Sequence, residues 1–154
     1  MLIYAFHGGG FIYRTLDSED ATCSRIVAAM EILVVSISYR HAPQHPFPAA
    51  RHDVLDEFDW FVENAEAFRG DVGNVIMDGI SAGANLAAVV ALNRNAALSR
   101  KYENDEDATI KGLVLDMPWL VINKEKLFYQ DFSSKEKSSR VQCAEAPVLF
   151  GRVL

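Results

Sequence analysis

Four short, almost continuously apolar runs constrain the fold of this chain more than any other feature. They span Leu2–Phe6, Ile32–Ser38, Asn74–Asp78 and Ile110–Asp116, and β-branched and aromatic residues are frequent in them. Such runs are typical of strands that are buried on both faces, as in a parallel sheet. Because stretches with helical periodicity separate them, the sequence predicts an α/β fold with about four parallel strands and helices on both faces of the sheet.

The connecting stretches carry apolar residues at helical spacing. In the first, Asp17 or Ser18 is placed to cap a helix whose apolar residues are Ile26, Val27 and Met30. The second ends at Gly70, and its apolar positions are Ala50, Val54, Phe58, Phe61 and Ala65. The third, residues 82–98, is rich in alanine, which lets a helix lie close to a sheet. Three prolines between His41 and Pro48 predict a rigid loop.

Composition narrows the function classes. The 154 residues suffice for one domain with a sizeable core. A net charge of −6 argues against nucleic-acid binding, which needs a basic face. No apolar run approaches the roughly 18 residues that span a bilayer, and the start lacks the basic region of a signal peptide. Cys23 and Cys143 cannot form a framework of disulfides, and their spacing is not that of metal ligands. This favours a cytoplasmic location. The alternative is a protein with an N-terminal signal that is missing from this sequence.

Two polar stretches are expected at the surface. The acidic run 103–107 is typical of a solvated loop, and the charged, serine-rich stretch 124–140 predicts a surface helix or loop. No internal repeat or linker divides the chain, so a single domain over residues 1–154 is expected.

The first chemical signal is Gly79-Ile80-Ser81-Ala82-Gly83, which matches G-x-S-x-G between a predicted strand and a predicted helix. A serine on such a sharp turn points its hydroxyl outward at the carboxyl end of the sheet. Glycines are needed there because the turn and the close helix–strand packing leave no room for a Cβ atom. The alternative is a serine that only caps a helix beside glycine; the strand-turn-helix context favours a nucleophile.

The second signal is His7-Gly8-Gly9-Gly10, directly after the first strand. Successive glycines let backbone N–H groups approach a ligand, and acyl transfer needs such donors where the oxyanion forms. A flexible glycine turn is the alternative. A phosphate-binding loop is excluded because no lysine follows at Walker spacing and G-x-G-x-x-G is absent.

Together these motifs resemble the hormone-sensitive-lipase-like branch of the α/β-hydrolase fold. His7-Gly8-Gly9-Gly10-Phe11 is similar to its HGGG oxyanion motif, and residues 79–85 to its Gly-Asp-Ser-Ala-Gly-Gly-Asn elbow. Residues 39–50, Tyr-Arg-His-Ala-Pro-Gln-His-Pro-Phe-Pro-Ala-Ala, resemble its Tyr-Arg-Leu-Ala-Pro-Glu-His-Pro-Phe-Pro-Ala loop, and Asp53 matches an aspartate that follows it. The sequence departs from these family motifs at four positions: Ile80 stands where the family has an acidic residue, Ala84 where it has a glycine, His41 where it has a leucine and Gln44 where it has a glutamate.

The resemblance implies carboxylic-ester hydrolysis with a small-molecule ester as substrate and with neither metal nor organic cofactor. It assigns Ser81 as the nucleophile and the backbone N–H groups of Gly9, Gly10 and Ala82 as oxyanion donors, which should converge near the Ser81 hydroxyl. By the same resemblance the site is supported structurally by His7, Gly8, Gly79 and Gly83.

The base of a catalytic triad is missing from the sequence. In this fold the order is Ser, then Asp or Glu, then His. All four histidines, His7, His41, His45 and His52, precede Ser81. Asp116 and Asp131 follow it, but a capped loop or a solvated carboxylate is the simpler interpretation of each. The four runs resemble the third to sixth strands of an eight-stranded sheet, so we expect an incomplete domain that lacks the N-terminal cap and the C-terminal strands bearing the acid and the histidine.

Three alternatives stay open. In the first alternative, the chain is an esterase, or a large piece of one, with little activity of its own. In the second, it is a ligand-binding member of the fold, as in plant gibberellin receptors, which resemble this family and lack the catalytic histidine. In the third, the chain does not fold stably, because its sheet has open edges. A further arrangement, with His41, His45 or His52 as the base, would be new to this fold.

Overall fold

The predicted parallel sheet is present in the computed structural model, which describes residues 1–98 and 108–118. Its strands are β1 (Leu2–Phe6), β2 (Leu33–Ile37), β3 (Val75–Ile80) and β4 (Ile110–Asp116), in the order β2-β1-β3-β4. All three pairings are parallel. β1 therefore lies between β2 and β3. The connection from β1 to β2 and the connection from β2 to β3 run in opposite directions across the sheet, which creates a switch point of the kind where ligands bind in open α/β sheets.

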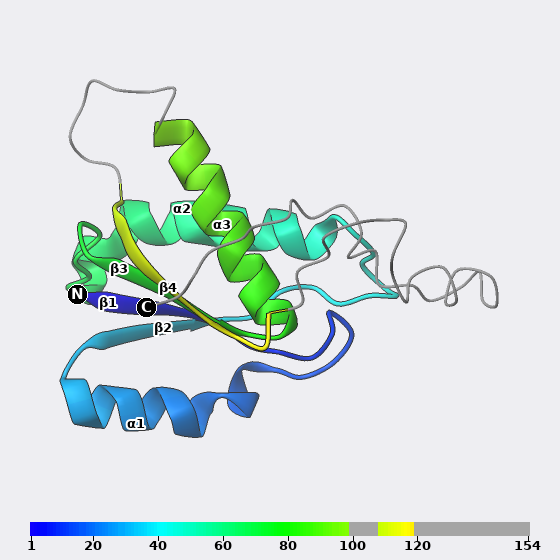
Figure 1. Ribbon diagram of the computed structural model, residues 1–154, viewed down its shortest axis with the longest axis horizontal. Coiled ribbons are helices and arrows are strands. Elements are labelled where there is room, and N and C mark those ends of the chain that lie inside the picture. The colour runs from blue at the N-terminus through cyan, green and yellow to red at the C-terminus, as the bar shows by residue number, and fades with distance from the viewer. Residues whose placement is uncertain (99–107, 119–154) are drawn as a thin grey trace.

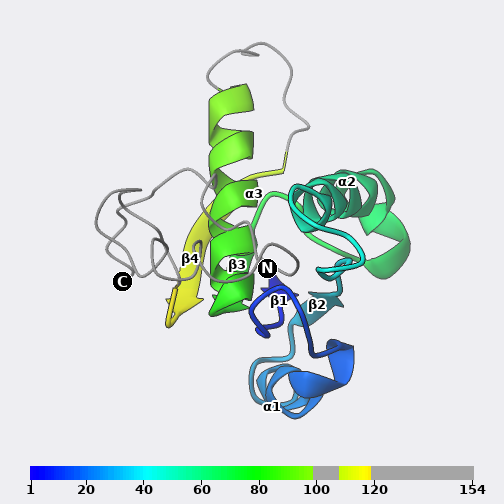
Figure 2. The ribbon, with the colours of Figure 1, turned by 90° about the vertical axis from the view of Figure 1, so that its right-hand side faces the viewer.

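Helices cover both faces of the sheet (Figure 1). Helix α1 (Asp20–Met30) packs against β2 on one face, whereas α2 (Ala49–Asn64) and α3 (Ala82–Leu98) lie on the other. Figure 2 shows α1 beneath β1 and β2, on the opposite side from α2 and α3. Short 3-10 helices, η1 (Leu16–Ser18) and η2 (Ala65–Phe68), precede α1 and follow α2.

The core lies between the sheet and the pair α2 and α3. Every residue of β1 is buried, which explains why its sequence is apolar throughout rather than alternating. The Tyr4 ring meets the rings of Phe58 and Phe61 on α2 at centroid distances of 5.2 and 5.6 Å. Helix α3 packs against both β3 and β4, and its alanines permit this close approach.

One predicted helix boundary is wrong and another is confirmed. Asp17 and Ser18 do not cap α1; they lie in η1, where the Ser18 hydroxyl accepts a hydrogen bond from the Thr15 N–H at 3.2 Å. Glu19 then occupies the N-cap of α1. The segment of α2 and η2 ends just before Gly70, as predicted, and Arg69 adopts a left-handed conformation there, with φ 57°.

Of the remaining structural predictions, one is confirmed and the others concern residues that the structure does not describe. The proline-rich stretch from His41 to Pro48 contains neither helix nor strand, as expected of a loop. The predictions for residues 103–107 and 124–140, and for Asp131 and Cys143, lie outside the described residues. No helix in the described part of the chain is both long and apolar enough to cross a membrane.

Candidate active site

Strand register brings the two glycine motifs together. Phe6 at the end of β1 pairs with Gly79 near the end of β3, so the segments that follow both strands start side by side. A Cβ atom at Gly8 would lie 3.2 Å from both the carbonyl oxygen and Cγ2 of Ile80. The His7–Gly10 loop is therefore in contact with the turn that carries Ser81.

Ser81 occupies a sharp turn between β3 and α3. Its φ of 55° is in the left-handed region, which a residue with a side chain seldom adopts. The turn is held at both ends: the Ser81 N–H donates to the carbonyl of Asp116 at 2.8 Å, and the Ser81 carbonyl accepts from the N–H of Asn85 at 3.2 Å. The expectation that Ser81 lies at a strand-to-helix turn is confirmed, and such strained positions are concentrated at functional sites.

The two glycines that flank Ser81 are required by steric contact. A Cβ atom at Gly79 would lie 2.5 Å from the backbone of Gly83. One at Gly83 would overlap the carbonyl oxygen of Phe6 and lie 2.6 Å from that of His7. The first turn of α3 therefore packs directly on the carboxyl end of β1, which explains in atomic terms the glycines of the G-x-S-x-G pattern.

The glycine loop has a backbone that side chains seldom permit. Gly9 and Gly10 have φ of 120° and 61°. The Gly9 carbonyl accepts hydrogen bonds from the N–H groups of Ile12 and Tyr13 at 3.1 and 3.2 Å, and a Cβ atom at Gly9 would overlap the Tyr13 carbonyl oxygen. The loop thus turns back on itself immediately after β1.

Three backbone N–H groups of the two motifs donate to no oxygen of the described residues. Within residues 1–98 and 108–118, no oxygen accepts a hydrogen bond from the N–H of Gly9, Gly10 or Ala82. Ala82 is the first residue of α3, where the helix dipole adds partial positive charge. These N–H groups are therefore available to an anionic or carbonyl oxygen.

His7 supports the glycine loop from inside the protein. The ring is fully buried, and its Nδ1 donates to the Gly8 carbonyl at 2.7 Å. Because a carbonyl only accepts, a hydrogen lies on Nδ1, and Nε2 shares a hydrogen bond with the Ser38 hydroxyl at 3.3 Å. One ring nitrogen therefore binds the backbone of the glycine loop, and the other binds the Ser38 side chain.

Tyr39 is a second support that the sequence motifs contain but that sequence reasoning did not single out. Its ring stacks on His7 at 4.5 Å between centroids, and its hydroxyl donates to the His7 carbonyl at 2.9 Å. The next segment also contacts the loop, since the Ala42 N–H donates to the Phe11 carbonyl at 2.9 Å. The tyrosine at the start of the proline loop was the sequence signal that could have identified this support. No spacing rule, however, connects Tyr39 with His7, which lies 32 positions earlier.

Arg40 anchors the proline loop to α2. Its Nε and Nη2 donate to the Asp53 carboxylate at 3.0 and 2.6 Å, and its backbone N–H donates to the same carboxylate at 2.9 Å. Burial acts to raise the pKa of Asp53, but these hydrogen bonds outweigh it, so the pKa is lower than usual. Asp53, matched in the sequence to a family aspartate, therefore fixes the segment that carries Tyr39.

The other histidines differ in their surroundings. His41 packs edge-on against the rings of His7 and Tyr39 at 5.7 and 5.3 Å, and its buried Nε2 has no hydrogen-bond partner among the described residues. Burial, with a smaller contribution from His7, lowers the pKa of His41, so the ring is neutral at pH 7. His45 and His52 are exposed.

Comparison with known proteins agrees with this geometry. The family model described as alpha/beta hydrolase fold matches residues 3–149. The carboxylic ester hydrolase LipN of Mycobacterium tuberculosis is 40% identical over 115 residues, which cover 73% of this chain and 30% of that protein. Carboxylesterase 20 of Arabidopsis thaliana is 34% identical over 126 residues, covering 77% and 36%. The hyperthermophilic esterase of Pyrobaculum calidifontis superposes with a TM-score of 0.68 at 34% identity, covering 77% and 36%.

The chain belongs to the α/β-hydrolase fold family. The relatives named above are esterases and carboxylic-ester hydrolases, and the predicted resemblance is confirmed at this level. The chain spans about a third of the length of these relatives.

Proposed function

We propose that this chain carries the nucleophile and the oxyanion donors of a serine carboxylesterase. The observation that supports it best is the contact between the two motifs: Ser81 lies on a strained turn against a glycine loop whose N–H groups have no acceptor among the described residues. A helix dipole at Ala82 adds to the same electrostatic environment.

In the proposed reaction, the Ser81 hydroxyl attacks the carbonyl carbon of a small or medium apolar ester. Negative charge develops on the carbonyl oxygen and is stabilised by the N–H groups of Gly9, Gly10 and Ala82, each worth about 3 kcal/mol in such sites. The alcohol leaves, Ser81 carries the acyl group, and water then releases the acid. His7 takes no proton in this scheme, because its Nδ1 is bound to the Gly8 carbonyl and its Nε2 to the Ser38 hydroxyl.

The scheme needs an acid and a base that follow the nucleophile, and no histidine follows Ser81 in the sequence. The chain also spans about a third of its relatives. We therefore propose that residues 1–154 are an incomplete α/β-hydrolase domain, with little activity by themselves. A cytoplasmic location rests only on the two cysteines and stays an expectation.

A chimera tests the role of Ser81. Residues 1–118 are joined to the downstream part of the Pyrobaculum calidifontis esterase that follows the aligned region. Hydrolysis of 4-nitrophenyl acetate should rise by at least about 10²-fold over the 154-residue chain, since acid–base assistance contributes that much. Ser81→Ala should abolish the gain, whereas Ser24→Ala, at an exposed position on α1, should retain it. An active chimera that is indifferent to Ser81→Ala would contradict the proposal.

The lack of a downstream histidine specifically favours a second candidate, a binding protein that retains the pocket without turnover. The open reading frame beyond the codon for Leu154 separates the two. An aspartate followed by a histidine there favours the esterase, and a full-length homologous segment with the histidine replaced favours the binding protein.

A further inference from the structure

Three aromatic rings pack together at the start of the glycine loop. His7 and Tyr39 stack on each other, and the ring of His41 stands nearly perpendicular to both, at 82° and 86°. His7 binds the Gly8 carbonyl through Nδ1, and the Tyr39 hydroxyl donates to the His7 carbonyl. The two stacked rings therefore hold the backbone of the loop, and the His41 side chain packs against both of them.

The surroundings of His41 favour a neutral ring. Its Nε2 is buried and has no hydrogen-bond partner among the described residues. The family motif that this segment resembles has leucine at the same position, as expected of a side chain that packs against aromatic rings. A protonated ring carries a hydrogen on both nitrogens, so it would bury a charge and an Nε2–H donor without an acceptor. Protonation should therefore drive the ring out of its contact with His7 and Tyr39.

The charged groups near His41 in the described part of the chain do not compensate a positive charge. Burial of the ring and, to a smaller extent, the neighbouring His7 lower the pKa of His41. The carboxylate of Asp53 is already bound by the side chain and the backbone of Arg40. His45, whose backbone N–H donates to the His41 carbonyl at 2.8 Å, brings another imidazole rather than an acid. A protonated His41 therefore finds no free carboxylate among these neighbours.

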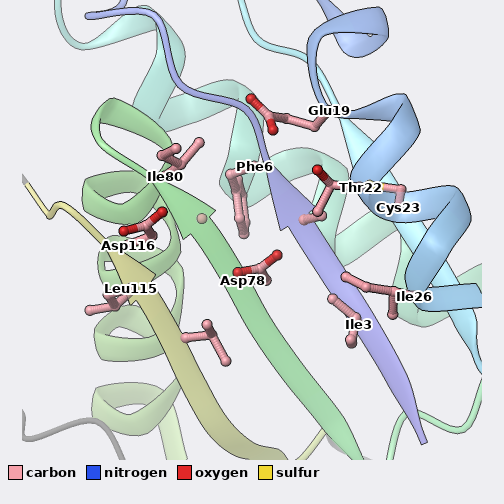
Figure 3. A pocket seen from close by; sticks show the side chains of 13 residues that line it. Ile3, Phe6, Glu19, Thr22, Cys23, Ile26, Asp78, Ile80, Leu115 and Asp116 are labelled. Atoms are coloured by element: carbon pink, nitrogen blue, oxygen red, sulfur yellow. The ribbon is translucent and has the colours of Figure 1, made fainter. Parts of the chain in front are cut away.

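A second group of titratable side chains lies on the face of the sheet that carries α1. Glu19, Asp78 and Asp116 line a pocket of about 620 Å³ between α1 and the strands β3 and β4 (Figure 3). Glu19 is paired with Arg14 at 3.0 Å, and burial raises the pKa of Asp78. Since the Asp116 carbonyl accepts from the Ser81 N–H, the pocket adjoins the turn that carries Ser81. Its carboxylates are therefore the competing source of any pH dependence at this site.

We propose that His41 is a pH-sensitive positioning residue of the glycine loop. The neutral ring packs against His7 and Tyr39 and keeps the loop in its folded-back conformation. When His41 takes a proton, its ring leaves this contact, the stacked pair loses its neighbour, and Gly9 and Gly10 become mobile. The catalytic meaning of this change rests on the proposed function, since it matters only if the two glycines donate to an oxyanion. The response of the loop to pH does not depend on that function.

NMR spectroscopy of the isotope-labelled 154-residue chain tests the coupling. Between pH 8 and pH 5, the His41 ring signals should titrate with a midpoint below the ordinary value of 6.5. The amide signals of Gly9 and Gly10 should shift with the same midpoint. Below it, the Tyr13 N–H, which donates to the Gly9 carbonyl, should lose about tenfold of its protection against hydrogen exchange, after correction for the intrinsic rate. Glycine amides that do not respond while His41 titrates would overturn the proposal.

Variants identify the group that titrates. His41→Leu and His41→Gln, whose side chains take no proton, should both abolish the pH response of the glycine amides and keep the circular dichroism spectrum of the parent. His45→Leu, at an exposed position of the same segment, should retain the response. Glu19→Gln/Asp78→Asn, which removes two carboxylates of the pocket, should retain it as well. A response that persists in both His41 variants, or that is lost with the pocket carboxylates, would overturn the proposal.

These measurements require no turnover, so they do not depend on the role of Ser81. If the chimera is indifferent to Ser81→Ala while the loop responds to His41, the esterase function fails and the pH response of the loop stands. If the chimera depends on Ser81 while the loop ignores the charge of His41, the present proposal alone fails.

Discussion

At the scale of single residues, the site depends on how closely backbones approach one another. The first turn of α3 packs on the end of β1 at Gly83, and the glycine loop folds back at Gly9. The G-x-S-x-G and His-Gly-Gly-Gly motifs explain these glycines in general terms. The particular neighbours, the carbonyls of Phe6 and Tyr13, come from separate segments, and no local pattern identifies them.

Gly83→Ala should therefore be strongly destabilising. Its Cβ atom would overlap a backbone carbonyl that cannot rotate away, so we expect the free energy of unfolding to fall by about 3 kcal/mol. Gly112→Ala is the matched control, because nothing lies within 4 Å of the Cβ position there. Urea denaturation followed by circular dichroism measures both. Equal losses in the two variants would refute the steric explanation.

His41→Leu should stabilise the protein. The buried Nε2 of His41 has no partner among the described residues, and a leucine side chain removes that desolvation cost, worth about 1 kcal/mol. Because the pKa of His41 is lowered by folding, the unfolded chain binds more protons near pH 6, so the gain should grow as the pH falls below 6.5. Thermal denaturation at pH 7.5 and 5.5 checks this, with the exposed His45→Leu as control. A loss of stability would show that Nε2 has a partner.

At the scale of elements, the sequence predicted β1, β4 and α3 to the residue, and β2 and β3 within two residues. These elements are specified by continuous apolar runs or by alanine content. The start of α1 was predicted wrongly because Asp17 and Ser18 are good capping residues, and the competing capping box between Thr15 and Ser18 starts a 3-10 turn instead.

Helix α2 contains a carboxyl group whose titration should be measurable. Burial, with repulsion from Asp53, raises the pKa of Glu57 to about 7 from an ordinary value of 4.5. The native state therefore binds more protons than the unfolded chain in this window, and the free energy of unfolding falls as the pH rises from 4.5 through 7. The full shift corresponds to about 3 kcal/mol, which contact with solvent reduces to about 1 kcal/mol.

Glu57→Gln should remove this dependence. Above pH 7 the variant should be more stable than the parent by about 1 kcal/mol, and near pH 4.5 the two should be alike. Glu63→Gln, at an exposed position on the same helix, is the control. Urea denaturation at pH 5 and 8 provides the measurement. A parent protein whose stability rises over this range, with Glu57→Gln reversing the trend, would contradict the assignment.

At the scale of the whole molecule, sequence reasoning reached the fold class and the family. It could do so because the two glycine motifs directly follow or end apolar runs that form strands, and because motifs in this order resemble one family. The support of the site by Ser38, Tyr39 and the Arg40–Asp53 pair required the structure, since it depends on side chains from the segments that follow β1 and β2 and from α2.

The 154-residue chain alone should be a poor catalyst. Without a base, the donors of the glycine loop leave only a faint residual rate, and Ser81→Ala should change hydrolysis of 4-nitrophenyl acetate by less than about twofold. Initial rates against buffer measure this. Brisk turnover that Ser81→Ala abolishes would instead require His41, His45 or His52 as the base, and alanine substitution at each would identify it.

The position of β1 between β2 and β3 has a consequence for how the sheet forms during synthesis. Of the four described strands, Leu2–Phe6 are synthesised first, yet they form a strand paired on both sides, with residues 33–37 on one side and 75–79 on the other. This strand therefore waits for about two thirds of the described residues to be made before both of its edges are paired. During that interval an apolar segment with exposed backbone is available to chaperones and to other nascent chains.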